Sequence, residues 1–105
     1  MNRLEQLQQL EKEDPQDPFI RYALALEYLK SDRRSSEAAF KELIHQHPDY
    51  LPSYYPAAHL MIDLEQPAVA EQYFLKGMEV AKAQNDFKTY RELMSAYESW
   101  KEGIV

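Results

Sequence analysis

Three histidines are the side chains of this sequence best suited to acid–base or metal chemistry near neutral pH. His45 and His47 lie two residues apart, and Asp63 follows His59 by four residues. Side chains two apart on a helix point about 200° from one another, so His45 and His47 cannot share a metal ion. His59 and Asp63 would lie on one helix face, as a base and its orienting carboxylate do. No nucleophile or second acid lies beside them, so we expect a non-enzymatic protein, with a small enzyme using His59 as the less favoured alternative.

Composition excludes several other kinds of site. The 105 residues include no cysteine, which excludes disulfides, thiolate zinc sites and a cysteine nucleophile. Glycine occurs only at Gly77 and Gly103, so no glycine-rich loop is available to bring backbone amides close to a phosphate. We therefore expect no metal and no cofactor.

The charge balance argues against a nucleic-acid partner. Lysine and arginine number 12 against 18 aspartates and glutamates, giving a net charge of -6. Proteins that bind nucleic acids usually carry a basic surplus to neutralise phosphates. The acidic balance favours instead a protein partner with apolar or basic residues.

The sequence also lacks the apolar segments that direct proteins to membranes. Its first residues, from Met1 to Gln6, contain no apolar run of the signal-peptide type. No stretch approaches the roughly 18 uncharged apolar residues that span a bilayer. We expect a cytoplasmic protein that does not contact a membrane.

Apolar residues at three- and four-residue spacing, interrupted by prolines and small polar residues, predict a chain of helices. Asp17, Ser35 and Asp86 are the expected amino-terminal caps of three of them, and Pro67 opens another. Pro56 is expected to forfeit a hydrogen bond and to bend its helix near the first turn. The helices are expected near residues 2–12, 18–31, 35–47, 52–64, 67–84 and 86–100.

Part of this pattern occurs twice. The segment 22–28, which reads YALALEY, precedes the segment 55–61, YPAAHLM, by 33 residues. Pro15 precedes Pro48 by the same distance, and a weaker third copy begins at Tyr90. Self-similarity at a period of this length is typical of proteins built from stacked helix–turn–helix units.

The residues of the copies resemble those of the tetratricopeptide repeat (TPR) family. In the first unit the matching positions are Arg21, Leu24, Ala25, Tyr28, Phe40, Leu43 and Pro48, and the small residue of the second helix falls near Ser36 to Ala38. In the second unit they are Tyr54, Ala57, Ala58, Met61, Ala70, Phe74 and Gly77. The second unit departs from the family pattern because it lacks the closing proline.

The resemblance implies an all-α fold, a right-handed solenoid of about six helices packed as antiparallel pairs. Small residues would let helix axes approach closely, and aromatic side chains would fill the space between units. We expect one domain over residues 1–105. Its parts would be a half-repeat at 1–16, repeats at 17–50 and 51–85, and a carboxy-terminal helix within 86–105.

The resemblance also implies a concave groove that binds a peptide or a helix of another protein. By position, the groove residues would be Phe19, Tyr22, Leu26, Leu29, Tyr55, His59, Ile62, Arg91, Ser95 and Glu98. An alternative is that the first helix covers Leu26 and Leu29, and that Tyr22 and Tyr55 only pack on each other. Some relatives hold acidic carboxy-terminal tails with a set of Lys, Asn and Arg side chains, which this groove lacks except for Arg91.

A structural role is the second alternative. The last helix carries three aromatic residues, Tyr90, Tyr97 and Trp100, over a wide sector. If Trp100, Ile104 and Val105 were exposed, a symmetric homodimer through this helix would bury them.

Overall fold

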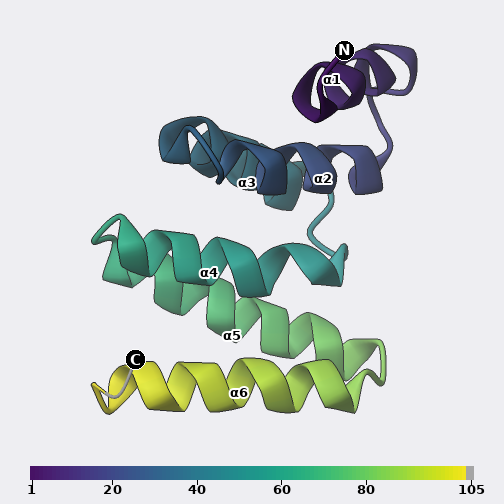
Figure 1. The fold of residues 1–105 in the computed structure, drawn as a ribbon. Coiled ribbons are helices and arrows are strands. Elements are labelled where there is room, and N and C mark those ends of the chain that lie inside the picture. The colour runs from purple at the N-terminus through teal and green to yellow at the C-terminus, as the bar shows by residue number, and fades with distance from the viewer. Residues whose placement is uncertain (104–105) are drawn as a thin grey trace. The chain divides into compact units, whose positions relative to one another are not determined.

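The computed structural model describes residues 1–103, which form six α-helices, one short 3₁₀ turn and no strand. The all-α expectation is thus confirmed over this range. Figure 1 labels the helices in chain order. They are α1 (Arg3–Glu13), α2 (Pro18–Tyr28), α3 (Arg33–Gln46), α4 (Tyr54–Asp63), α5 (Pro67–Ala83) and α6 (Phe87–Lys101), with the 3₁₀ turn η1 (Leu51–Ser53) before α4.

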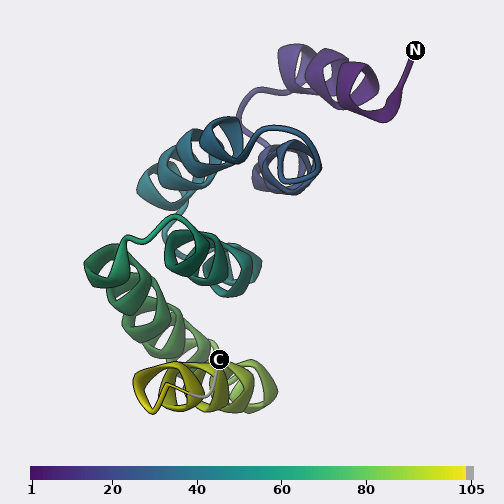
Figure 2. The ribbon, with the colours of Figure 1, turned by 60° about the vertical axis from the view of Figure 1, so that its left-hand side comes forward.

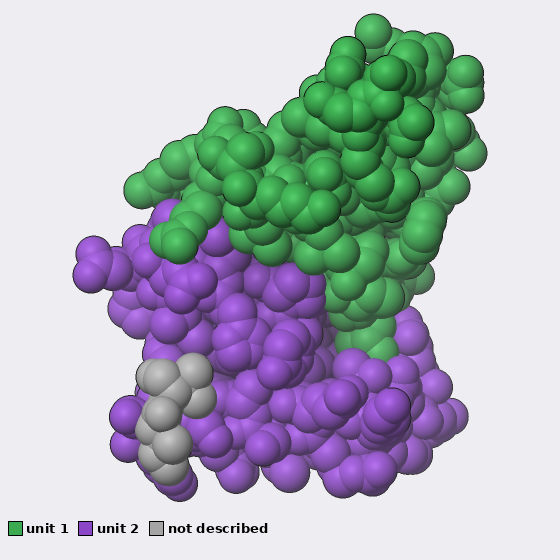
Figure 3. Space-filling model, viewed as in Figure 1, with its two compact units in different colours: residues 1–53 green, residues 54–105 purple. Residues whose placement is uncertain are grey.

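The chain divides into two compact units, residues 1–53 and 54–105, coloured separately in Figure 3. In unit 1, α1 packs on α2 and α2 packs on α3. In unit 2, α4 packs on α5 and α5 packs on α6. Each helix reverses the direction of the one before it within its unit, as Figures 1 and 2 show. The expected packing of antiparallel neighbours is confirmed inside each unit, while the assignment of residues 1–105 to one domain stays a prediction.

Most helix starts follow the capping rules. The Asp17 carboxylate accepts a hydrogen bond from the amide of Phe19 at 2.9 Å, and that of Asp86 accepts one from Thr89 at 3.0 Å. Pro67 occupies the start of α5, where a missing amide hydrogen costs nothing. Asn85 has a φ of 59°, the left-handed conformation that ends a helix. These predicted boundaries are confirmed.

The predicted start of the third helix is wrong. Asp32, not Ser35, caps α3, because its carboxylate accepts hydrogen bonds from the amides of Arg34 and Ser35, each at 3.2 Å. The Ser35 hydroxyl donates to the same carboxylate at 2.6 Å, and this bond is the largest of those that lower the pKa of Asp32. An ionised cap also interacts favourably with the positive end of the helix dipole. The helix therefore begins at Arg33, and α2 ends at Tyr28 rather than near residue 31.

The fourth helix also begins later than expected, which changes the position of Pro56 within it. The segment from Leu51 to Ser53 forms a 3₁₀ turn, and α4 begins only at Tyr54. Pro56 thus lies in the first turn of α4, where backbone amides have no acceptor within the helix. The proline forfeits no bond inside α4, which removes the reason to expect a bend.

Close approach between helices organises the core of unit 2. The small residues Ala57, Ala58, Ala70 and Gly77 are all buried. A Cβ atom on Gly77 would lie 2.7 Å from the Cβ of Tyr54 on α4 and 3.0 Å from the Cδ1 of Leu93 on α6. Only a residue without a side chain fits there. The packing role predicted for the small residues is confirmed.

Unit 1 builds its core with a serine where the repeat pattern expects a small residue. Ser36 is fully buried, and its hydroxyl donates a hydrogen bond to the carbonyl oxygen of Ala25 at 2.7 Å. This bond joins α3 to α2 and satisfies a polar group that burial would otherwise penalise. Phe40 and Leu43 are completely buried on the same helix, whereas Ala38 is exposed.

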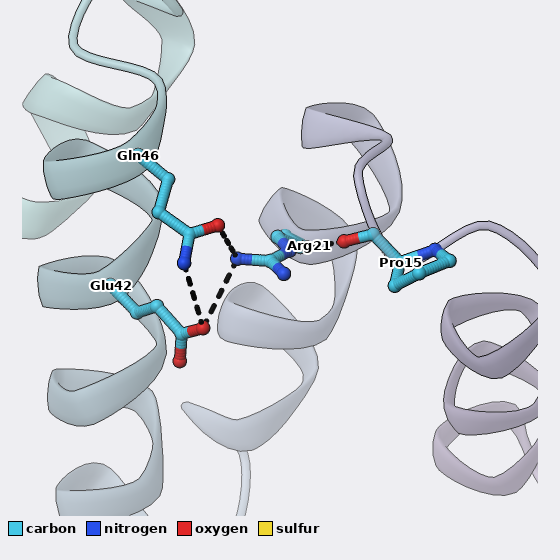
Figure 4. Close-up of polar contacts among 4 residues, drawn as sticks. All are labelled: Pro15, Arg21, Glu42 and Gln46. Atoms are coloured by element: carbon cyan, nitrogen blue, oxygen red, sulfur yellow. Dashed lines mark hydrogen bonds and ion pairs between the residues drawn. The ribbon is translucent and has the colours of Figure 1, made fainter.

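Arg21 connects three parts of unit 1, as Figure 4 shows. Its Nε donates to the carbonyl oxygen of Pro15 at 2.7 Å, in the loop between α1 and α2. Its terminal nitrogen donates to the Gln46 amide oxygen at 2.6 Å and pairs with Glu42 at 3.2 Å, both on α3. The Arg21 side chain is only 13% exposed, whereas its partner Glu42 is 61% exposed, and the charge of the guanidinium strengthens each of these bonds.

The Gly77→Ala substitution tests the close approach in unit 2. The added methyl group must displace the Tyr54 side chain or the backbone beneath it, and overpacking of this kind costs about 1–3 kcal/mol. Alanine also has a higher helix propensity than glycine, which offsets part of this loss. We therefore expect a net decrease of about 1–2 kcal/mol in the free energy of unfolding. Urea denaturation followed by circular dichroism measures it. Gln72→Ala, at an exposed position of α5, is the control and should change stability little; an equal loss in both variants would contradict the prediction.

The Arg21→Lys substitution tests the connection in unit 1. A lysine keeps the charge but cannot reach Pro15 and Gln46 together, because its single ammonium group lacks the guanidinium fork. We expect a loss of about 1–2 kcal/mol in stability and faster amide hydrogen exchange in α1. The control is Arg34→Lys, whose exposed side chain pairs with Glu37 at 3.0 Å and with no other carboxylate of residues 1–103. Unchanged exchange in α1 of the Arg21 variant would show that the connection is not needed.

Candidate partner-binding site

A groove of about 570 Å³ lies between α4 and α6, the two helices of unit 2 that pack on α5. Its lining brings together four of the residues predicted from the repeat positions, Tyr55, His59, Arg91 and Ser95. The remaining lining residues are Lys88, Glu92, Ala96 and Ser99. One wall is therefore aromatic and comes from α4, while the other is polar and comes from α6.

The α4 wall is a short row of rings. The centroids of Tyr55 and His59 lie 4.5 Å apart with the two rings tilted, and the His59 ring lies nearly perpendicular to that of the buried Phe74, with 5.8 Å between their centroids. Tyr55 is 45% exposed, so it offers a large ring to a ligand without needing to move. Rigid aromatic side chains in this position are typical of protein-binding surfaces.

The environment of His59 keeps its imidazole uncharged at neutral pH. Burial lowers the pKa of His59, and the carboxylate of Asp63 opposes this effect without reversing it. The Nε2 atom is buried and has no hydrogen-bond partner among the described residues. His59 therefore acts within unit 2 as a packing ring between Tyr55 and Phe74.

The α6 wall carries two cations and one carboxylate. Lys88, Arg91 and Glu92 are exposed, and Ser95 continues the same helix face. In the described part of the chain, Lys88 and Arg91 form no ion pair or side-chain hydrogen bond, and Lys88 acts on Asp86 through its charge alone. This wall thus presents free positive charge to the groove.

Unit 1 has a more apolar hollow of about 330 Å³ beside α2. The predicted residues Phe19, Tyr22 and Leu26 line it together with Ala23, Glu27, Lys30 and Arg3. Arg3 is the only lining residue from α1, so the first helix leaves this hollow open, and Phe19 is 61% exposed. Tyr22 packs on Tyr50 with 5.8 Å between ring centroids, and partial burial raises its pKa.

Not every predicted residue reaches a hollow. Ile62 and Leu29 are half-buried, and neither they nor Glu98 lines the groove of unit 2 or the hollow of unit 1. Conversely, the prediction missed Lys88, Glu92 and Ser99. Lys88 and Ser99 lie three residues before and eight after Arg91, so helical spacing from Arg91 could have found them.

The aromatic residues predicted for self-association are engaged inside unit 2. Tyr97 and Trp100 pack on Phe74 with centroid distances of 5.6 and 5.8 Å, and Lys82 lies over the Tyr90 ring at 5.9 Å. All three of these aromatic side chains are half-buried. The dimer stays a prediction, and Ile104 and Val105 lie outside the described residues.

A carboxylate holds this aromatic cluster in place. Glu71 accepts hydrogen bonds from the Tyr97 hydroxyl at 2.7 Å and from the Lys101 ammonium group at 3.1 Å. These bonds, that of Tyr97 first, lower the pKa of Glu71. The contacts join α5 to α6 and give Tyr97 a structural role within the unit.

Residues 1–103 contain no group of three or more histidine, aspartate or glutamate side chains that could hold a metal ion. The described helices also include none with both the length and the apolar character needed to cross a bilayer. The cytoplasmic location stays a prediction.

Antiparallel helix pairs that meet at small residues define the chain as a helical-repeat protein. Two solved structures of a tetratricopeptide repeat domain protein from Salinibacter ruber are similar to it over most of its length. The solution NMR structure is 40% identical, with a TM-score of 0.74, and the match covers 79% of this chain and 85% of that one. The crystal structure is 36% identical, with a TM-score of 0.76, covering 86% and 100%. The chain belongs to the tetratricopeptide repeat family. No protein-family model and no curated protein matches it.

The half-buried His59 makes the stability of unit 2 depend on pH. Folding lowers the pKa of His59. The contribution of His59 to stability is therefore complete above its pKa in the unfolded chain, about 6.5, and is lost as the pH falls through its lower pKa in the folded protein. Between pH 7.5 and 5.5 we expect the urea midpoint of the native protein to fall further than that of His59→Phe, which keeps a ring on Phe74. His45→Gln, at an exposed position, should fall as the native protein does. Parallel curves for all three proteins would contradict the prediction.

Proposed function

We propose that this chain is a non-enzymatic protein-interaction module that binds a peptide or a helix of a partner protein in the groove of unit 2. The observation that carries the proposal is the meeting of Tyr55, His59, Arg91 and Ser95 in one groove. The resemblance of the sequence to the tetratricopeptide repeat family implies, from repeat positions, that these four residues face a partner. The hollow of unit 1, with Phe19 at its edge, offers a second apolar surface of the same kind.

The composition of the groove suits a protein ligand. Interfaces between proteins gain most of their energy from a few aromatic and arginine side chains surrounded by polar groups. Tyr55 and Arg91 are both exposed and face the groove from opposite walls. Ser95 and Ser99 add hydroxyl groups that can donate to, or accept from, a peptide backbone.

Catalysis by His59 has less support. A general base must present an accessible nitrogen to its substrate, and one of the two ring nitrogens of His59, Nε2, is buried. Its ring is also held between Tyr55 and Phe74. Self-association through α6 has less support as well, because Tyr97 and Trp100 already pack on Phe74.

Selection of binders from a random peptide display library tests the proposal. The selected peptides are synthesised, and their dissociation constants are measured by fluorescence anisotropy for the native protein and for Tyr55→Ala/His59→Ala/Arg91→Glu. We expect the triple variant to bind at least about tenfold more weakly, which is about 1.4 kcal/mol. The control is Gln72→Ala/Leu75→Ala/Lys76→Glu, with three exposed positions on α5 that do not line the groove.

Loss of His59 could weaken the fold, because its ring packs on Phe74. A second variant, Tyr55→Ala/Arg91→Glu, changes only exposed side chains, and circular dichroism shows whether it stays folded. The groove assignment is wrong if this folded variant binds the selected peptides as tightly as the native protein does.

A further inference from the structure

We propose that the groove of unit 2 selects an acidic segment of its partner, with aspartate or glutamate side chains held by Lys88 and Arg91 and a neighbouring apolar side chain packed on Tyr55. This inference rests on the proposed function and adds the chemistry of the ligand to it. It also reverses the preference for a basic or apolar partner that the net charge of the chain favours.

The first observation is the local charge of the groove. The whole chain has 18 acidic and 12 basic residues, yet the groove is lined by two cations and a single carboxylate, Glu92. Electrostatic selection between partners depends on the charges that lie at the interface more than on the net charge of the molecule. The groove is therefore a positive site on an acidic protein.

The second observation is that these cations have no ion-pair partner among residues 1–103. Elsewhere in unit 2, Lys76 pairs with Glu79 at 3.3 Å and Lys101 pairs with Glu71 at 3.1 Å. Within the same described range Lys88 and Arg91 form no such pair, although acidic residues outnumber basic ones. Their donors are free to bind an added carboxylate, and the fork of Arg91 can hold one by two hydrogen bonds.

The third observation concerns the opposite wall. Tyr55 is 45% exposed and lies against the uncharged ring of His59, so this wall offers an apolar face rather than another charge. An apolar side chain of the ligand can cover it while neighbouring carboxylates reach α6. A basic segment would meet the like charges of Lys88 and Arg91, and Glu92 is the one acidic side chain among the described residues that line the groove.

The composition of peptides selected from a random display library tests the inference. We expect the pool selected on the native protein to be enriched in aspartate and glutamate over lysine and arginine relative to the starting library. The pool selected on Lys88→Glu/Arg91→Glu should lose or reverse this enrichment. Both positions are exposed, and circular dichroism verifies that the variant is folded.

Variants in which glutamine replaces lysine or arginine separate the effect of the charges in the groove from that of the net charge of the protein. Lys88→Gln/Arg91→Gln should bind the selected acidic peptides about tenfold or more weakly. Lys76→Gln/Lys82→Gln changes the net charge equally at positions outside the groove and should bind them as the native protein does. Binding should also weaken as the salt concentration rises. Equal loss in both variants would overturn the assignment to the groove.

The other outcomes of the selection also test the inference. Enrichment of neutral or basic peptides would overturn the acidic preference while leaving peptide binding intact. Failure to enrich any peptide would overturn the proposed function and this inference with it. Finally, the acidic peptides are compared with and without an amidated carboxy terminus; unchanged binding supports capture of side-chain carboxylates, and loss on amidation would overturn it.

Discussion

The architecture of unit 2 depends on how closely three helices approach one another at Gly77. The absence of a side chain there lets Tyr54 of α4 and Leu93 of α6 both pack against α5 within van der Waals distance. Because α4 and α6 both pack on α5, the close approach at Gly77 determines the positions of both helices. The groove, with aromatic rings on one wall and charged side chains on the other, is the space between α4 and α6.

Much of the fold was predictable because its determinants are local and periodic. The buried positions Ala25, Ala58, Ala70 and Phe74 follow from repeat spacing, since each must face a neighbouring helix at the same depth. The errors occurred where two local solutions compete. Asp32 and Ser35 are both residue types that can cap a helix. Asp32 is the cap because its carboxylate accepts hydrogen bonds from two backbone amides, while the Ser35 hydroxyl donates to that carboxylate.

The site was predictable in part, for a related reason. The resemblance to the family could assign Tyr55, His59, Arg91 and Ser95 to a groove by their repeat positions, but the extent of a groove depends on where the side chains leave space. The sequence could not show that Ile62 stays outside the groove. Nor could the net charge of -6 reveal local polarity, because that depends on which cations find partners. Within residues 1–103, six of the 12 lysines and arginines pair with carboxylates, and Lys88 and Arg91 do not.

Arg21 has a consequence for how this chain can vary through evolution. Its guanidinium binds the backbone oxygen of residue 15, not a side chain, and any amino acid at position 15 supplies that oxygen. The loop between α1 and α2 can therefore exchange side chains freely at this contact, whereas the arginine cannot be exchanged without losing the bond. Substitutions are therefore expected to accumulate in the loop and to be rare at Arg21 and at its partners Glu42 and Gln46 on α3.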